Sequence, residues 1–212
     1  MDSITVQLFG GCIATIIPLL FVWAMINDRN SKNIILFFCW GIFAGLLAYI
    51  VNSFFASTPG QADRVTTTIA PIVEEVCKGL PLLLFLQAKR HQHVNERIVY
   101  YAMASGIGFS IEESIYYFYT SVGNLNDVIL LVIRTLTTSL MHGMSTAIIG
   151  VGLLILHKQR HILMPVTFGL FALSTCIHAL FNLLLPTELA MLAMLMPIGL
   201  YFAGLVFLKE TY

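Results

Sequence analysis

The chain has 212 residues, of which 58% are hydrophobic and 10% are charged, and its mean hydropathy is +0.87. This composition excludes a soluble globular domain and indicates a polytopic integral membrane protein, with the lipid bilayer as its surroundings. The formal net charge is zero at pH 7, so the charge balance predicts no nucleic-acid partner.

Apolar runs recur along the chain at the length that crosses a bilayer, roughly 20 residues. They predict an all-α membrane bundle of about seven transmembrane helices. Only short polar turns separate the runs, so we expect a single membrane domain over residues 1–212, with its motif-bearing core at about 65–184. The expected spans are 4–26, 34–56, 65–88, 98–120, 128–156, 162–184 and 189–208.

Lysine and arginine gather at one set of span ends. These residues are Arg29, Lys32, Lys89, Arg90, Arg97, Lys158, Arg160 and Lys209. The opposite ends carry Arg64 together with Asp2, Asp63, Asp127 and Glu188. Because loops rich in lysine and arginine stay in the cytoplasm, the N-terminus is expected outside and the C-terminus in the cytoplasm.

The third span holds Glu74, Glu75 and Lys78 inside an otherwise apolar run. A charged side chain at the bilayer centre costs about 2.5–3.5 kcal/mol on insertion scales, so residues of this kind usually have a function. A structural ion pair between Glu74 and Lys78, four residues apart on one helix face, is the simplest alternative. Glu75 points about 100° away from Glu74, so one such pair cannot serve both carboxylates.

Three further spans carry polar residues in the middle and outer half of the membrane, judged from the helical rise of about 1.5 Å per residue. They are Glu112 and Glu113 in the fourth span, Arg134, His142 and Thr146 in the fifth, and His178 and Asn182 in the sixth. Each histidine has its polar neighbour four residues later, on the same helix face. Ionisable groups from four helices therefore converge in depth, which predicts an intramembrane site.

Residues of these types allow hydrolysis. A buried glutamate can deprotonate a water, and a histidine or asparagine side chain can stabilise a developing oxyanion. We expect no cofactor and assign no metal ligand. A zinc site built from His142, His178 and glutamates is the open alternative, since these side chains bind zinc.

The same residues resemble the motifs of the PrsW-like intramembrane proteases, which are relatives of the CAAX-prenyl endopeptidases and of bacteriocin-processing membrane proteins. The resemblance extends in order over four successive spans. Its parts are Glu74-Glu75-Val76-Cys77-Lys78, then Gly106-Ile107-Gly108-Phe109 with Glu112 and Tyr116, then Arg134, His142, Thr146 and Gly150, and finally His178 with Asn182. One departure is Glu113, which stands where the family commonly has asparagine.

The resemblance implies a glutamic-type endopeptidase in a bacterial or archaeal cell membrane. Its substrate would be a membrane-tethered protein or peptide, for example an anti-sigma factor, cut near the outer surface. Glu74 and Glu75 would activate water, with Glu75 as the preferred base, and Glu112 would assist. His142, His178 and Asn182 would stabilise the oxyanion or position the peptide, supported by Lys78, Glu113, Arg134 and Thr146.

Two other functional classes fit the same residues. A proton-coupled transporter or channel is one, because chains of glutamate and histidine also relay protons. A non-catalytic membrane scaffold of the same fold is the other, since it would retain the polar residues that pack its helices.

Overall fold

The structure is a computed structural model that describes residues 3–26, 31–58, 65–88, 95–121, 125–156 and 160–211. Within these residues there are seven α-helices, a short π-helix and no strand, which confirms the predicted all-α membrane bundle. The elements are α1 (Ser3–Met25), α2 (Ser31–Ala56), η1 (Val65–Ile69), α4 (Ala70–Ala88), α5 (Arg97–Ser121), α6 (Leu125–Leu156), α7 (Arg160–Leu184) and α8 (Ala190–Thr211).

Each expected span coincides with one helix, and the third coincides with η1 and α4 together; the ends differ by three residues or fewer. Helical hydrogen bonding continues past the apolar boundaries into polar residues, whose backbone groups would otherwise be unpaired. Three helical stretches of the described chain are long and apolar enough to cross a membrane by themselves, Ser31–Ala56, Ile129–Ile155 and Met164–Leu184.

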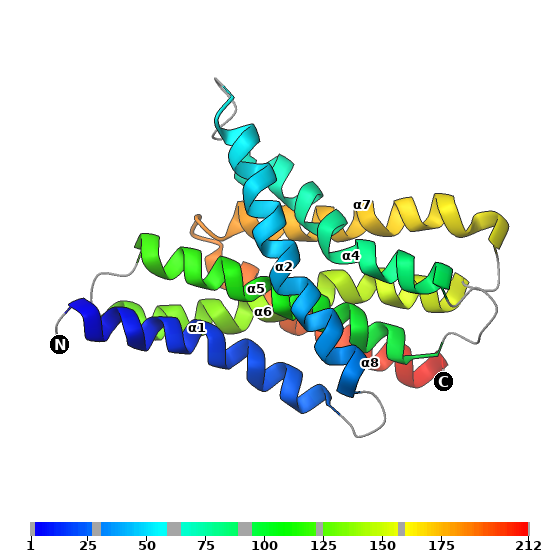
Figure 1. Cartoon of the computed structure of the whole chain (residues 1–212), viewed down its shortest axis with the longest axis horizontal. Helices are drawn as coiled ribbons and strands as arrows, with labels where there is room; N and C mark the ends of the chain where they lie inside the picture. Colours follow the sequence, from blue (N-terminus) through cyan, green and yellow to red (C-terminus); the bar gives the residue numbers. More distant parts are fainter. Residues whose placement is uncertain are drawn as a thin grey trace.

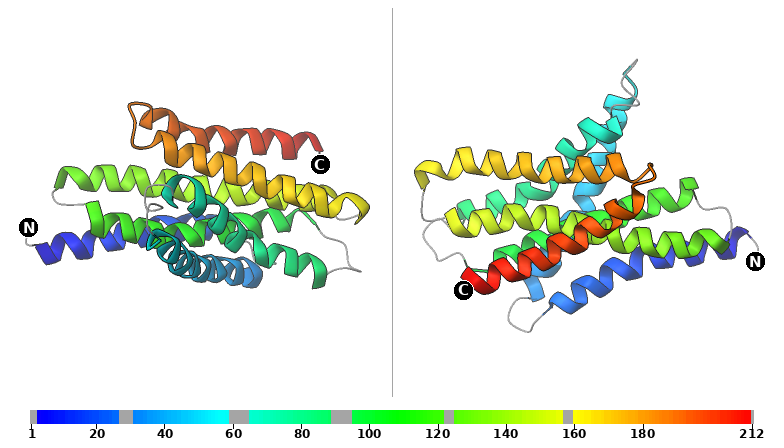
Figure 2. Two further views of the ribbon diagram at one scale, coloured as in Figure 1. Left: turned by 90° about the horizontal axis from the view of Figure 1, so that it is seen from above. Right: turned by 180° about the vertical axis from the view of Figure 1, so that it is seen from behind.

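The helices run back and forth along the bundle, with α5 near its centre (Figure 1). α5 packs most extensively against α6 and α2, and it also contacts α1 and α4. Seen from above, α7 and α8 lie on one side of α5 and α6, and α2 lies on the other (Figure 2). α2 crosses α5 and α6 obliquely, so its C-terminal end projects from the bundle together with the beginning of α4 (Figure 1).

α1 begins and α8 ends at opposite ends of the bundle (Figure 1), as an odd number of spans requires. Which end faces the cytoplasm stays a prediction. Several of the charged positions on which that prediction rests lie outside the described residues, namely Asp2, Arg29, Asp63, Arg64, Lys89, Arg90 and Lys158.

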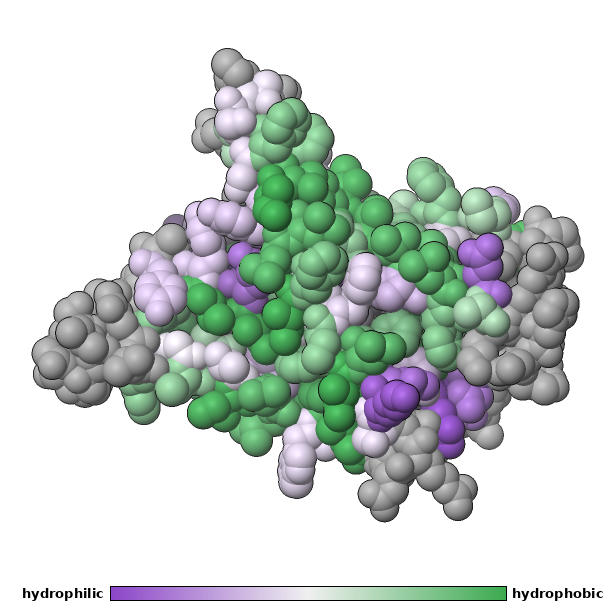
Figure 3. Space-filling model, viewed as in Figure 1, coloured by the Kyte–Doolittle hydropathy of each residue, from purple (hydrophilic) through white to green (hydrophobic). Residues whose placement is uncertain are grey.

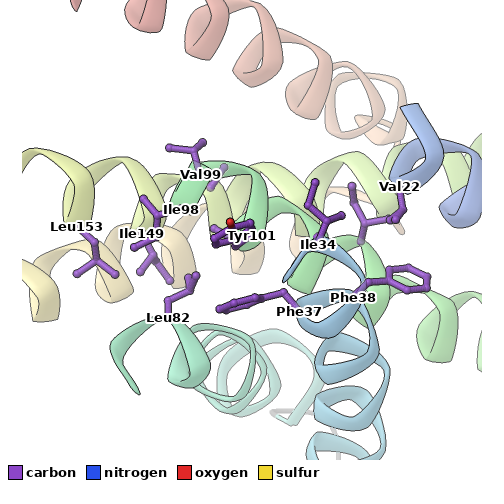
Figure 4. Close-up of a cluster of buried hydrophobic side chains, with 14 of the residues drawn as sticks. Val22, Ile34, Phe37, Phe38, Leu82, Ile98, Val99, Tyr101, Ile149 and Leu153 are labelled. Carbon is purple, nitrogen blue, oxygen red and sulfur yellow. The ribbon is translucent and has the colours of Figure 1, made fainter. Parts of the chain in front are cut away.

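A hydrophobic cluster joins five helices at the end of the bundle where α4 finishes and α5 starts (Figure 4). Phe37 of α2 stacks on Tyr101 of α5 with ring centroids 5.2 Å apart, and Leu82 of α4 and Ile149 of α6 are fully buried beside them. Leu82 lies one turn beyond Lys78, and Ile149 two turns beyond His142. The apolar core thus begins where the polar residues of α4 and α6 end.

The outer surface is apolar as well. The face shown in Figure 3 is mainly hydrophobic, with its hydrophilic side chains gathered in small patches. Large apolar side chains such as Trp23, Met164 and Phe168 point outward, whereas Glu75, Lys78, His142 and other polar groups are buried. An apolar exterior around a polar interior is the arrangement that a lipid environment favours.

Candidate active site

Glu75 of α4 lies at the centre of the buried polar network and is fully buried. Its Oε1 accepts hydrogen bonds from Nζ of Lys78 at 2.5 Å, from Nδ1 of His178 at 2.9 Å and from Oγ of Ser145 at 3.1 Å. Its Oε2 accepts one from Oγ of Ser174 at 2.6 Å. Three of these donors meet Oε1 and one meets Oε2, and the side chain has no exposed surface, so Glu75 offers no accessible oxygen to a water.

Glu74 makes fewer polar contacts than Glu75. Its side chain is 14% exposed, its Oε1 accepts a hydrogen bond from Nδ2 of Asn52 at 3.3 Å, and its Oε2 lies 3.5 Å from Nε2 of His178. The alternative of an ion pair between Glu74 and Lys78 is wrong, because Lys78 pairs with Glu75, three residues before it. Glu74 is therefore the carboxylate of α4 that a water can reach.

His178 of α7 joins the two glutamates. In the neutral imidazole, Nδ1 donates its hydrogen to Glu75 and Nε2 keeps its lone pair. Nε2 is buried, has no hydrogen-bond partner in the described part of the protein, and faces Oε2 of Glu74. Two acceptors thus face each other across 3.5 Å, and such a gap suits a water or a cation.

His142 of α6 has both ring nitrogens occupied. Nζ of Lys78, which can only donate, lies 2.8 Å from Nδ1. Nε2 therefore carries the ring hydrogen and donates it to Oε2 of Glu113 at 2.5 Å. The imidazole packs between Phe109 and His178, with ring centroids 5.0 Å and 4.8 Å away, so its orientation is fixed from all sides.

Glu113 of α5 belongs to this network, whereas its neighbour Glu112 lies on another helix face. Glu113 is 23% exposed, and its Oε1 is 3.7 Å from Nη2 of Arg134. The Arg134 guanidinium stacks on the Tyr117 ring at 3.7 Å. The Cβ of Glu112 packs against Gly45 of α2 instead. Glu113, which was expected only to support the site, contacts His142. Glu112, which was expected to assist catalysis, does not share that contact.

Two other predicted residues have different surroundings. Thr146 Oγ1 donates to the backbone carbonyl of His142 at 2.8 Å and not to its ring. Asn182 follows one turn after His178 on α7 and is partly buried.

A glycine sets the spacing of α5 and α6 at the site. A Cβ at Gly106 would fall on the carbonyl oxygen of His142, so only glycine lets the two backbones approach this closely. The close approach brings His142 within reach of Glu113. The glycine of the expected second motif therefore has a packing function beside the histidine of the third.

The chain matches the family described as PrsW family intramembrane metalloprotease over residues 30–208. The chain belongs to the PrsW family. The resemblance seen in the motifs is thereby confirmed, and family membership assigns the protein to the intramembrane proteases, integral to the membrane. No curated protein and no solved structure matches it.

The PrsW motifs do not include three side chains that the structure adds to the site. Ser145 follows His142 by three residues and Ser174 precedes His178 by four, so helical spacing could have placed both on the histidine faces. Asn52 had a weaker signal, a single amide close to the end of the apolar second span. All three contact a glutamate of α4.

Three side chains of this PrsW member offer metal-ligand atoms within 4.8 Å of one another, Glu74, His142 and His178. Carboxylate and imidazole groups suit zinc, and the family is described as metalloproteases, so the expectation of no cofactor is not supported. The fit is nevertheless incomplete. Oε2 of Glu74 and Nε2 of His178 can each bind a metal. Both nitrogens of His142, in contrast, are already hydrogen-bonded, to Lys78 and Glu113.

Proposed function

We propose that this protein hydrolyses a peptide bond of a membrane-tethered protein within the bilayer, with Glu74 as the base that activates water. The observation that carries the proposal is the contrast between the two glutamates of α4. Glu75 is fully buried with four donors within hydrogen-bond distance, whereas Glu74 is partly exposed and faces an unpaired nitrogen of His178. The preferred base therefore moves from Glu75 to Glu74.

Glu74 and His178 can hold the attacking water between them. The water donates one hydrogen to Oε2 of Glu74 and the other to Nε2 of His178, which leaves an oxygen lone pair for the carbonyl carbon of the substrate. As the water oxygen bonds to that carbon, its proton passes to Glu74. Glu74 then gives the proton to the leaving nitrogen as the C–N bond breaks.

His142 is the candidate donor to the oxyanion. Its Nε2 hydrogen is held by Glu113, and its ring is fixed by Lys78 on the opposite nitrogen. A carbonyl oxygen that becomes negative during attack competes with Glu113 for this hydrogen, so the donor is oriented in advance. Asn182, one turn after His178, is the second candidate donor. Glu113 and Arg134 position His142 and are not assigned a chemical step.

The substrate class rests on family membership and on the depth of the site. An anti-sigma factor or another single-span regulator cut near the outer surface remains the example that we propose. Intramembrane hydrolysis is favoured over proton transport because the family is one of proteases, and over a scaffold because Nε2 of His178 is unpaired beside a partly exposed Glu74.

A zinc-dependent protease is the second candidate, favoured by the grouping of Glu74, His142 and His178. Zinc would polarise the scissile carbonyl and activate a water. Glu74 and His178 would be its first ligands, and His142 would have to exchange Lys78 or Glu113 for the metal.

The proposed base is tested with Glu74→Gln, which keeps the size of the side chain. Membrane proteomes of cells with the wild type and with E74Q are compared at equal expression, and a full-length substrate should accumulate only with E74Q. Glu188→Gln is the control, since it neutralises an exposed carboxylate in the turn between α7 and α8 and should leave cleavage intact. Full-rate cleavage by E74Q contradicts the proposal.

A further inference from the structure

Asn52 interrupts the apolar run of α2 close to the C-terminal end of that helix. Its Nδ2 donates to Oε1 of Glu74 at 3.3 Å. It lies on a helix that carries none of the family motifs quoted above. α2 therefore reaches the catalytic carboxylate through one amide, although the rest of its buried face is apolar or glycine.

Few buried side-chain polar atoms of the described residues lack a hydrogen-bond partner. These atoms are Asn52 Oδ1, Ser114 Oγ, Thr135 Oγ1, Thr138 Oγ1 and His178 Nε2. Two of them belong to the side chains that flank Glu74, with Asn52 at Oε1 and His178 at Oε2. An amide that served helix packing alone would be expected to use both its ends, because unpaired buried polar groups are unfavourable.

We propose that Asn52 is a positioning residue for peptide hydrolysis, which holds Glu74 through Oε1 so that Oε2 stays aligned with Nε2 of His178. The inference rests on the proposed role of Glu74 as base. Asn52 itself touches neither the water nor the substrate peptide. Asn52 instead fixes the side-chain rotamer of Glu74, because a carboxylate that is hydrogen-bonded at one oxygen presents the other oxygen in a fixed direction.

The base is otherwise weakly fixed. Glu75, the adjacent residue, has four donors, whereas Asn52 Nδ2 is the hydrogen-bond donor recorded for Glu74. A misplacement of about 1 Å at a reacting group costs on the order of 100-fold in rate. Loss of the Asn52 amide should therefore lower kcat about 10- to 100-fold and leave KM within about twofold.

Asn33 offers a matched control on the same helix. It is also an asparagine whose Nδ2 bonds across to another helix, at 3.1 Å from the Tyr101 hydroxyl, but it lies about 28 Å away along α2. Asn52→Leu and Asn33→Leu each remove one interhelical amide bond. Equal shifts in melting temperature with a loss of kcat only in N52L would separate positioning from stability.

The experiment measures kcat, KM and melting temperature of purified N52L, Asn52→Asp, N33L, E74Q and wild type in proteoliposomes. The substrate is the protein whose full-length form accumulates in E74Q membranes. N52D keeps the shape of the side chain but places a carboxylate oxygen where the N–H was, so its kcat should fall at least as far as that of N52L. Binding of the same substrate should be unchanged in N52L.

The outcomes separate this inference from the proposed function. If E74Q is inactive and N52L or N52D keeps kcat within twofold of the wild type, Asn52 does not position the base. An equal fall of kcat in N33L also overturns the inference, because it would trace the effect to helix packing. Full activity of E74Q overturns the proposed base itself.

Discussion

Nδ1 of His178 lies 2.9 Å from Oε1 of Glu75, and this contact decides which ring nitrogen faces the site. Since the carboxylate accepts the Nδ1 hydrogen, the Nε2 lone pair is presented to Glu74, 3.5 Å away. The two adjacent glutamates therefore have different tasks. Glu75 orients the imidazole, and Glu74 is free for a water.

This division of tasks predicts different phenotypes for Glu74→Gln and Glu75→Gln. E75Q leaves the Lys78 ammonium fully buried without its counter-charge, which should lower the free energy of unfolding by about 3–5 kcal/mol. E74Q should lose turnover with little change in stability, because Glu74 has no ion pair with Lys78 to lose. Thermal unfolding of both purified variants measures the difference.

The double variant Glu75→Gln with Lys78→Met is the control for that prediction. It removes both charges of the buried pair at similar volume, so the melting temperature should return towards that of the wild type while activity stays low. Equal stability of E75Q and the wild type would show that the Glu75–Lys78 pair does not hold α4 in place.

Ser174→Ala should weaken both stability and activity. The Ser174 hydroxyl of α7 has two acceptors for its one hydrogen, Oε2 of Glu75 at 2.6 Å and the Ser145 carbonyl at 2.8 Å, and hydrogen bonds to charged groups contribute about 1.5–3 kcal/mol. Ser57→Ala is the matched control, because the exposed Ser57 hydroxyl bonds only to the nearby carbonyl of Phe54 among the described residues. Denaturant titration measures the two variants, and an S174A protein as stable as S57A would remove Ser174 from the support of Glu75.

Gly106→Ala tests the close approach of α5 and α6. Alanine normally favours a helix over glycine, but a Cβ at Gly106 meets the carbonyl of His142, so G106A should destabilise by about 1–3 kcal/mol. Gly169→Ala on α7 meets nothing within 4 Å and should be neutral or stabilising. The melting temperatures of the two variants test this prediction. A G106A protein more stable than the wild type would mean that α5 and α6 can move apart without loss of stability.

Metal removal separates the two candidate chemistries. If Glu74 is the base, dialysis against a zinc chelator should leave activity within about twofold, and zinc should be far below one ion per chain. Elemental analysis of the wild type and of His178→Ala measures the content. Stoichiometric zinc in the wild type that disappears in a folded H178A protein would instead favour the zinc-dependent reaction.

The helices could be predicted closely because most spans are long apolar runs between polar turns, and run length locates such a span. The grouping of Glu74, Glu75, His142 and His178 also followed from depth. Which glutamate has more hydrogen-bond donors around it could not be predicted, since the answer depends on hydroxyl groups that reach Glu75 from α6 and α7.

The sequence could not show whether Glu112 or Glu113 faces the site, because this also depends on contacts between helices. Adjacent residues on a helix differ by about 100°, and a motif read along the sequence does not fix which of them faces α6. Here the contact of Gly106 with the His142 carbonyl sets the register of α5, and Glu113 meets the imidazole. The packing of α5 against α6 therefore determines which glutamate meets His142, and the spacing of residues within α5 does not.

The ion pair of α4 has a consequence for how the chain is made. Synthesis delivers Glu75 and Lys78 to the translocon before Ser145 and Ser174 exist, because these hydroxyls come from α6 and α7. Among the described helices, α4 is not one that qualifies as a membrane span by apolarity alone, whereas its predecessor α2 does. The buried ion pair of α4 therefore lacks both hydroxyl partners until α6 and α7 have been made.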